Sequence, residues 1–204
     1  MTGETIVLQA IRLKGRPDGE TLRNALGVIG PDLGSMLSGL VAQGHCTESH
    51  GRFSLSTAGR DRLATLLADE RERIDHRLLD DCYTRFEHPN ATLKQVVTDW
   101  QLRSPTLAND HTDPDYDMAV LARFGVVHQQ FQPLLSEIIE LVPRLWPYRA
   151  RLQNAVRRVE AGEVKWLTAP LADSYHTVWF ELHEELIGLS GRTRLNEAAS
   201  GRAS

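Results

Sequence analysis

A change in hydrophobic spacing between residues 33 and 55 constrains the fold of this chain more than any other feature. The first part of that stretch repeats its apolar residues at the three- and four-residue intervals of one helix face: Leu33, Met36, Leu37, Leu40 and Val41. The second part has two short extended segments, residues 45–48 and 52–55, joined by a tight turn with Gly51 at its tip. The sequence therefore predicts a helix that is followed directly by a two-stranded β-hairpin.

Two more helices are expected ahead of this one. Residues 4–14 have helical spacing, and Asp18 is placed to cap a second helix over residues 19–26. Pro31 suits the first position of the third helix, where the missing N–H of proline does no harm. The first part of the chain is thus expected to hold three short helices and a hairpin.

A further helix should follow the hairpin, with Ser56 or Thr57 able to cap it. Together these elements predict a mainly α chain that begins with a winged helix-turn-helix domain, residues 1–60, whose wing is the small β-hairpin. The helical spacing then continues with many charged residues between the apolar ones, which predicts a connecting helix over residues 61–88. His88-Pro89-Asn90 is expected to break that helix.

The stretch GRFSLSTAGRDRLATLL, residues 51–67, resembles the wing and exit helix of MarR- and PadR-type transcriptional regulators. Those proteins typically show an aromatic or apolar strand, a Leu-(Ser/Thr) pair, and then a glycine followed by Arg and Leu. The resemblance covers roughly residues 4–75 and implies that residues 31–43 form the recognition helix, which would lie in the major groove of DNA. It implies contacts with bases, phosphates or the minor groove for these residues: Thr21, Arg23, Asp32, Ser35, Ser38, Gln43, His50 and Arg52.

The charge of this region leaves a second reading open. The recognition helix carries no Lys or Arg, and Asp32 near its start would repel phosphate. Residues 1–60 hold six basic and five acidic residues, and the whole chain has a net charge of −4, so a general attraction to nucleic acid or to anionic membranes is not expected. Two hypotheses follow: a homodimer that binds double-stranded DNA, or a winged helix that docks on a partner protein.

The rest of the chain is expected to be an all-α bundle, with a helical effector or dimerisation domain over residues 89–192 and a flexible tail over 193–204. Asn90 or Thr92 should start a helix that buries Trp100, and Pro133 should bend or break a later one. Pro143 should end that later helix. The next helix and the last one are expected over residues 144–161 and 171–189.

The acidic stretch NDHTDPDYD, residues 109–117, precedes the helix that contains Pro133. Its spacing lacks the glycine and glutamate of an EF-hand loop. Asp113 followed by Pro114 matches a helix cap with proline at the first helical position, and Asp115 and Asp117 would favour the helix dipole. Capping leaves three residues unexplained, and these remain candidates for ligand contact: Asn109, Asp110 and His111.

Arg144, Arg151 and Arg158 are spaced by seven and fall on one face of the 144–161 helix. A solvated face is the first interpretation, and an anionic ligand, nucleic acid or an acidic partner is the alternative. In the last helix, His176 and His183 lie on one face. They could be hydrogen-bonded within the bundle, hold a metal together with Asp173 and His128, or line a small-molecule pocket. The candidate ligand-binding residues are Trp100, Asn109, Asp110, His111, Tyr116, His128, Tyr175, His176, Trp179 and His183. No metal and no cofactor are expected, because His176 has no ligand partner at the four-residue spacing that places two ligands on adjacent turns.

The segments WQLR, NDHTDPDYD and SYHTVWFELHEEL resemble a helical region appended to some phosphoenolpyruvate-utilising, dikinase-like proteins. This resemblance implies a regulatory or docking module, because the chain has neither a glycine-rich phosphate loop nor a phosphohistidine-type motif. It is not expected to be an enzyme. The leading expectation is a transcriptional regulator with a helical ligand-binding or dimerisation domain; the alternative is a module that acts on a partner enzyme, perhaps of that class, without binding DNA.

Location follows from a few further features. Cys46 and Cys82 are far apart and outside any CxxC spacing, which favours reduced thiols. The first residues lack the basic and apolar pattern of a signal peptide, and no run approaches the length of about 18 apolar residues that spans a membrane. A cytoplasmic protein without membrane contact is expected.

Overall fold

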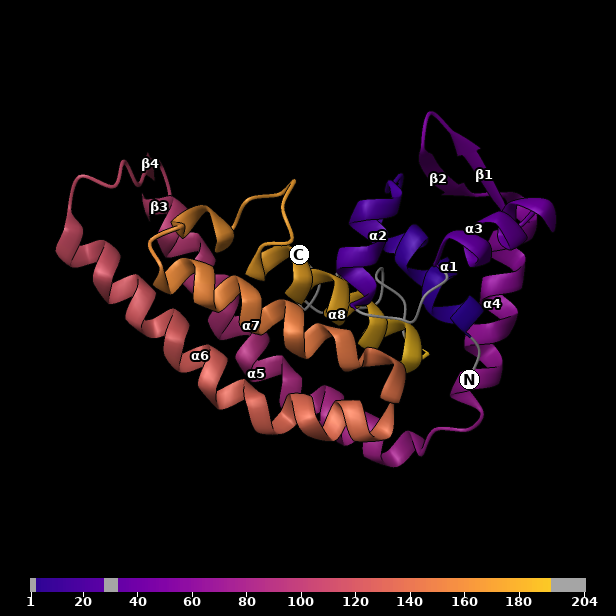
Figure 1. Ribbon diagram of the computed structural model, residues 1–204. Helices are drawn as coiled ribbons and strands as arrows, with labels where there is room; N and C mark the ends of the chain where they lie inside the picture. Colours follow the sequence, from indigo (N-terminus) through magenta and orange to yellow (C-terminus); the bar gives the residue numbers. More distant parts are fainter. Residues whose placement is uncertain (1–2, 28–32, 192–204) are drawn as a thin grey trace. The chain divides into compact units, whose positions relative to one another are not determined.

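The computed structural model describes residues 3–27 and 33–191 and is mainly α-helical. The chain divides into two compact units, Met1–Ile74 and Asp75–Ser204, here called the N-terminal unit and the C-terminal unit. Figure 1 shows their helices and strands in chain order, from indigo to yellow. In the described part of the chain, no helix combines the length and the apolar character needed to cross a membrane.

The N-terminal unit has the order of elements expected of a winged helix-turn-helix. Its elements are α1 (Gly3–Lys14), α2 (Gly19–Leu26), α3 (Leu33–Ala42), β1 (Cys46–Ser49), β2 (Arg52–Leu55) and α4 (Thr57–Arg71). One buried cluster joins the helices and the hairpin: Val7, Leu8, Ile11, Leu22, Leu26, Leu37, Leu40, Cys46 and Leu63. The hairpin is antiparallel, and the segment between α1 and α2 extends its sheet through a bridge from Asp18 to Arg52 and a bond from Phe53 N to Pro17 O of 2.9 Å.

Local sequence signals placed most of these boundaries. Asp18 accepts a hydrogen bond from Thr21 N and Ser56 from Gly59 N, so both predicted caps are confirmed. His50 and Gly51 have φ of 53° and 72°, the left-handed conformation that a two-residue hairpin turn requires. Pro31 and Asp32 lie outside the described residues. Val41, expected on the same face of α3 as Leu37 and Leu40, is 36% exposed. Only Leu37 and Leu40 of this helix are buried.

The expected connecting helix is two helices. α4 ends at Arg71, and α5 (His76–Gln101) begins after four intervening residues. The side chain of Asp75 accepts hydrogen bonds from Arg77 N and Leu78 N at the start of α5. An aspartate that bonds N–H groups two and three residues ahead favours a helix start over a helix interior, so the break falls at Asp75 despite the continuous apolar spacing. Pro89 does not break the helix as predicted, because α5 continues through it.

The C-terminal unit is built around two long helices that lie side by side, α5 and α6 (Pro114–Leu141). Each runs through an internal proline, Pro89 in α5 and Pro133 in α6. In α5, buried side chains lie on both sides of the proline, from Leu79 to Phe86 and from Asn90 to Trp100. Packing on both sides holds the helix together where local chemistry would interrupt it. The buried face predicted after Pro89 is confirmed at Leu93, Val96, Val97 and Trp100.

Shorter elements complete this unit. A small antiparallel hairpin that the sequence pattern did not indicate, β3 (Leu102–Ser104) and β4 (Leu107–Ala108), joins α5 to α6. After α6 come the 3-10 turn η1 (Pro143–Leu145), α7 (Trp146–Glu160), the 3-10 turn η2 (Val164–Trp166) and α8 (Tyr175–Leu189). The last helix starts later than predicted because Ser174 caps it, accepting from Thr177 N. The predicted stop at Gly162 is confirmed by its φ of 87°.

Candidate functional site

The exposed face of α3 is uncharged and carries polar side chains together with Val41. Ser35, Ser38 and Gln43 are exposed, as the sequence predicted, and Gln43 lies one residue beyond the end of the helix. In the neighbouring α2, Arg23 is exposed and Thr21 is half-buried. These side chains could donate or accept hydrogen bonds at a surface, but α3 itself offers no positive charge.

Positive charge gathers instead around β2, at residues here called the wing arginines: Arg16, Arg52 and Arg60. The Arg52 guanidinium donates from Nη1 to the carbonyl of Arg16 at 3.1 Å, and the Arg60 guanidinium donates from Nη1 to the carbonyl of Leu55 at 2.9 Å. All three arginines are exposed. Each guanidinium carries five N–H donors, so these backbone contacts orient Arg52 and Arg60 and leave donors free for an anion.

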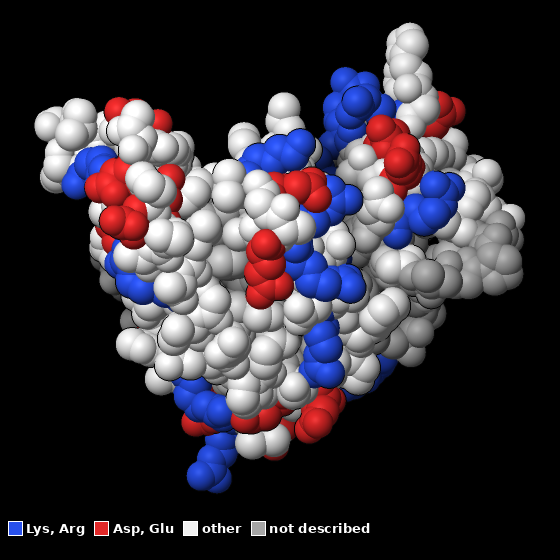
Figure 2. All heavy atoms as spheres, turned by 60° about the vertical axis from the view of Figure 1, so that its left-hand side comes forward, with Lys and Arg blue, Asp and Glu red and all other residues white. Residues whose placement is uncertain are grey.

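Two carboxylates accompany the wing arginines. Glu48 accepts a hydrogen bond from Gly51 N at 2.9 Å, and Asp18 caps α2. The hydrogen bond from the backbone N–H of Thr21 lowers the pKa of Asp18, so this carboxylate is charged at neutral pH. Figure 2 shows such mixing on one face of the molecule, where blue and red atoms lie interspersed among the described residues.

Sequence reasoning selected Arg52 and His50 at the wing but not Arg16 or Arg60. Arg16 lies 36 residues before Arg52, and only the pairing of the segment before α2 with β2 brings the two together. His50 contacts Ser49 Oγ through Nδ1 at 3.0 Å at the tip of the turn.

In the C-terminal unit, four of the predicted ligand-binding residues lie in the packed core. His128, Tyr175, Trp179 and His183 are each at most 8% exposed. The rings of Tyr175 and Trp179 lie 5.9 Å apart, and those of His128 and Tyr175 lie 5.7 Å apart. Trp179 Nε1 donates to Asn90 Oδ1 at 3.0 Å, and His183 Nε2 lies 3.3 Å from the Tyr83 hydroxyl. His176 of the same helix is exposed.

His128 has polar partners on both ring nitrogens. Its Nδ1 lies 3.3 Å from the Tyr175 hydroxyl, and its Nε2 lies 3.3 Å from Gln153 Oε1. A neutral ring satisfies both contacts when Nε2–H donates to Gln153 and the hydroxyl of Tyr175 donates to Nδ1. Burial lowers the pKa of His128 below its ordinary value and raises the pKa of Tyr175, so both groups are neutral near pH 7.

This buried histidine predicts a loss of stability in mild acid. Because the pKa of His128 is lower in the folded chain than in the unfolded one, the unfolded state takes up the proton first as the pH falls below about 6.5. His128→Gln should remove that contribution. The free energy of unfolding, measured by denaturant titration between pH 7.5 and 5, should fall more steeply for the parent protein. The difference in slope should be at most about 1.4 kcal/mol per pH unit for one proton. Parallel pH curves for parent and variant would show that His128 takes up its proton in the folded state.

The remaining predicted ligand-binding residues hold the loop before α6. The Asn109 amide donates from Nδ2 to Trp100 O at 3.1 Å and to Asp117 Oδ1 at 2.8 Å, while His111 Nδ1 lies 2.9 Å from Asp117 Oδ2. His111, with φ of 58°, also places its ring 4.4 Å from that of Trp100. Asp113 caps α6 by accepting from Tyr116 N, as predicted.

Asp110 and Tyr116 also find their partners close by. Asp110 Oδ1 accepts from Thr112 N and Thr112 Oγ1, and the Tyr116 hydroxyl donates to Asp99 O at 2.9 Å. The polar groups of residues 109–117 thus bond one another and the end of α5. These hydrogen bonds hold the loop against the end of α5, and the polar groups do not converge on one ligand. Nine of the ten predicted residues are therefore divided between the aromatic core and this loop with the end of α5, and the exposed His176 belongs to neither group.

The arginines spaced by seven do not form a solvated face. Arg144 and Arg151 are 4% and 7% exposed, while Arg158 lies at the surface beside Glu163. Arg151 contacts Asp173 at 2.8 and 2.6 Å and Glu181 at 2.7 Å, and Arg144 contacts Glu185 at 2.8 Å. The acidic partners of these two arginines belong to the same unit: Asp173 lies just before α8, and Glu181 and Glu185 lie within it.

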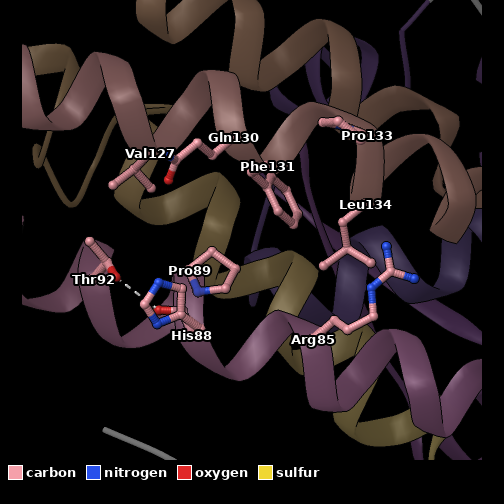
Figure 3. A pocket seen from close by; sticks show the side chains of 9 residues that line it. All are labelled: Arg85, His88, Pro89, Thr92, Val127, Gln130, Phe131, Pro133 and Leu134. Carbon is pink, nitrogen blue, oxygen red and sulfur yellow. Dashed lines mark hydrogen bonds between the residues drawn. The ribbon is translucent and has the colours of Figure 1, made fainter.

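A pocket that no sequence motif indicated lies between α5 and α6. It has a volume of about 240 Å³ and is lined by Arg85, His88, Pro89, Thr92, Val127, Gln130, Phe131, Pro133 and Leu134. Figure 3 shows these side chains converging from the two helices. The two prolines were interpreted from the sequence only as helix breakers, and nothing in the local pattern indicated that both helices would continue and lie side by side there.

The described residues contain no group of three or more His, Cys, Asp or Glu side chains placed to hold a metal ion. Asp173, assigned to such a site with His176 and His183 in one interpretation, contacts Arg151 instead. Comparison of the chain with protein-family models, with curated proteins and with solved structures found no match.

Proposed function

We propose that the chain is a DNA-binding transcriptional regulator whose N-terminal unit contacts double-stranded DNA. One observation carries the proposal: the wing arginines Arg16, Arg52 and Arg60 gather along β2, in the same compact unit as the exposed polar face of α3. Phosphate contacts supply most of the affinity of such proteins and fix their position on the duplex. A wing that carries these charges allows the recognition helix itself to be neutral.

In this proposal α3 enters the major groove and its polar side chains read base edges. Ser35, Ser38 and Gln43 are exposed and can bond base edges in the groove. Arg23 of α2 and the wing arginines hold the flanking phosphates. Because a single unit offers few basic side chains, a homodimer with half-sites about one helical turn apart would double the phosphate contacts. A small-molecule effector bound by the C-terminal unit would then shift the spacing of the two reading units.

The second candidate is a winged helix that docks on a protein, such as an enzyme of the phosphoenolpyruvate-utilising class that the C-terminal segments resemble. It is favoured by one observation: α3 has no basic residue and exposes Val41 at 36%. An uncharged helix with an exposed aliphatic side chain suits a protein surface better than a phosphate backbone.

The test is a fluorescence-anisotropy titration of the protein against labelled DNA from its own upstream region, at about 50 mM and about 200 mM salt. Arg52→Ala should weaken binding several-fold on any sequence and should reduce the salt slope by about one. Gln43→Ala should cost about 1–3 kcal/mol on the preferred site and relax its specificity. Arg157→Ala, which removes an exposed arginine from the C-terminal unit, is the matched control and should bind as the parent does.

Preference for the upstream DNA together with this ranking would support a regulator. Equal weakening by Arg52→Ala and Arg157→Ala would show that only the overall charge matters. Binding that is absent at low salt, or indifferent to sequence, would overturn the proposal in favour of the docking surface.

A further inference from the structure

We propose that the pocket between α5 and α6 binds a small neutral molecule with one ring and one hydrogen-bond donor. Calling that molecule the effector of a regulator rests on the proposed function, whereas the binding itself does not. The pocket is lined entirely by residues of the C-terminal unit and can be tested without DNA.

The first argument comes from the two prolines. Pro89 and Pro133 lie inside long helices and both line this one pocket. Proline is the most unfavourable residue in a helix interior, since it removes a hydrogen bond and its ring presses on the carbonyl four residues earlier. Departures from local preference of this kind are expected at functional sites. Two such prolines at one pocket, one in each of the helices that line it, indicate that the pocket has a function.

Pro89 also leaves an acceptor at the pocket. Because proline has no N–H, the carbonyl of Arg85 cannot accept the helical bond from residue 89. Arg85 and Pro89 both line the pocket, so this carbonyl is the one that a ligand there can reach. A hydroxyl or amine on the ligand can supply the missing donor.

The lining side chains and the volume of the pocket limit the polarity and the size of the ligand. Val127, Phe131 and Leu134 from α6 present apolar surface together with the two proline rings. A volume of about 240 Å³ is smaller than that of pockets for drug-sized ligands, which hold about 300–1,000 Å³. A single ring fits this space, and the pocket is open to solvent at the exposed side chains of His88 and Gln130.

Charge excludes an anionic ligand. The Arg85 guanidinium already contacts Glu137 at 2.6 and 2.8 Å and Asp81 at 3.1 Å. Two carboxylates therefore accompany the one arginine that lines the pocket, and a third negative charge would be repelled. The lining residues match a neutral ring with a donor, not a carboxylate or a phosphate.

A ligand held here touches the two longest helices of the unit at once. Its binding energy therefore favours the spacing of α5 and α6 that best encloses it. In a regulator, this is the means by which an effector could act on the C-terminal unit.

The test uses three probes of similar size on the purified full-length protein: phenol, toluene and benzoate. Binding is followed by chemical-shift changes of backbone amides in ¹H–¹⁵N NMR spectra. Phenol should shift and saturate signals of residues around Thr92 and Gln130. Toluene, which has no donor, should bind about three- to tenfold more weakly, and benzoate at least about tenfold more weakly.

Variants separate the pocket from the rest of the unit. Gln130→Trp places a large ring over the pocket from an exposed position and should weaken phenol binding at least about tenfold. Gln129→Trp makes the same change at the adjacent exposed residue, which does not line the pocket, and should leave binding unchanged. Pro89→Ala and Pro133→Ala each restore a backbone donor and should raise the melting temperature. Only Pro89→Ala should also reduce the preference for phenol over toluene, because Arg85 lines the pocket and Gln129 does not.

Each outcome decides something. Toluene binding as tightly as phenol would refute the role of the Arg85 carbonyl, and benzoate binding best would refute the charge argument. No saturable shift with any probe, or equal effects of the two tryptophan variants, would overturn the pocket itself. None of these results depends on DNA, and a failure of the DNA titration would leave them standing.

Discussion

Replacement of Arg151 by methionine is expected to lower the free energy of unfolding of the C-terminal unit by about 3–5 kcal/mol. The side chains of Arg151 and Glu181 are 7% and 5% exposed, and their charged groups lie 2.7 Å apart. Removing the guanidinium takes away the positive charge that lies 2.7 Å from the buried Glu181 carboxylate, which costs far more than the pair itself contributes. Asp173 is less affected, since its side chain is 23% exposed and can be hydrated.

Tryptophan fluorescence during urea denaturation measures this effect in the right part of the chain. All four tryptophans lie in the C-terminal unit, at positions 100, 146, 166 and 179. Arg157→Met is the matched control, because Arg157 is an exposed arginine of the same helix, and it should change the stability by no more than about 0.5 kcal/mol.

A double variant tests the cause. Arg151→Met combined with Glu181→Met removes both buried charges and should recover most of the stability lost by Arg151→Met alone. A loss below about 1 kcal/mol in the single variant, or no recovery in the double one, would mean that Glu181 is not an uncompensated buried charge once Arg151 is gone.

The network around Arg151 shows why local patterns failed here. Spacing by seven correctly placed Arg144 and Arg151 on one face, but composition alone assigns charged residues to solvent. Their partners Asp173, Glu181 and Glu185 follow in the chain, and Asp173 and Glu181 lie 22 and 30 residues beyond Arg151. Burial of Tyr148 and, after it, the charge of the neighbouring Glu185 carboxylate raise the pKa of the Tyr148 hydroxyl, which therefore stays neutral. Pairing over such distances depends on the packing of α7 against α8, which no short motif encodes.

Features that depend on a few neighbouring residues were predictable. The caps at Asp18, Ser56 and Asp113 each need only a side chain and an N–H three residues ahead. The hairpin turn needs only two left-handed residues. Helix continuity through Pro89 and Pro133 was not predictable in this way, because the packing that holds each helix together lies in another part of the sequence.

The candidate sites divide along the same line. The exposure of Ser35, Ser38 and Gln43 followed from helix periodicity, whereas the association of Arg16 with Arg52 needed the sheet pairing. The pocket between α5 and α6 depends on two stretches, residues 85–92 and 127–134, that are far apart in the sequence and lie side by side in the fold. Histidines and aromatic residues drew attention to the core instead, because side chains able to bind ligands are also side chains able to pack.

Gly59→Ala is expected to destabilise the N-terminal unit by about 2–3 kcal/mol. A Cβ built on Gly59 lies 2.8 Å from the carbonyl carbon of His45 and closer still to its oxygen. That backbone cannot retreat cheaply, since the same carbonyl accepts from Ser56 N at 3.0 Å and from Ser56 Oγ at 3.1 Å. An added methyl group must push the first turn of α4 away from the hairpin and disrupt these bonds.

Gly39→Ala in α3 is the matched control. A Cβ at Gly39 meets no atom within 4 Å, so the same substitution there should stabilise the helix by about 0.5–1 kcal/mol. Thermal unfolding followed by far-UV circular dichroism should separate the two variants. The tryptophan fluorescence midpoint should stay unchanged in both, because the N-terminal unit contains no tryptophan. A shift of both signals in Gly59→Ala would show that the two units unfold together.

Gly59 also lies in the stretch that resembles winged-helix regulators. In the stretch LSTAGR, Gly59 is required by the contact with His45, and Ser56 by the cap of α4 and its bond to Gly44 O at 2.6 Å. Both residues therefore serve the attachment of the wing to the exit helix, and neither requires DNA. The motif supports the fold, while the wing arginines and the exposed polar side chains of α3 support the proposed DNA binding. Gly59→Ala should consequently weaken DNA binding through loss of the folded wing, with a lowered melting temperature, whereas Arg52→Ala should weaken it at an unchanged melting temperature. If both variants lowered the melting temperature equally, Arg52 would be a structural residue of the wing, and the proposed phosphate contact would lose its support.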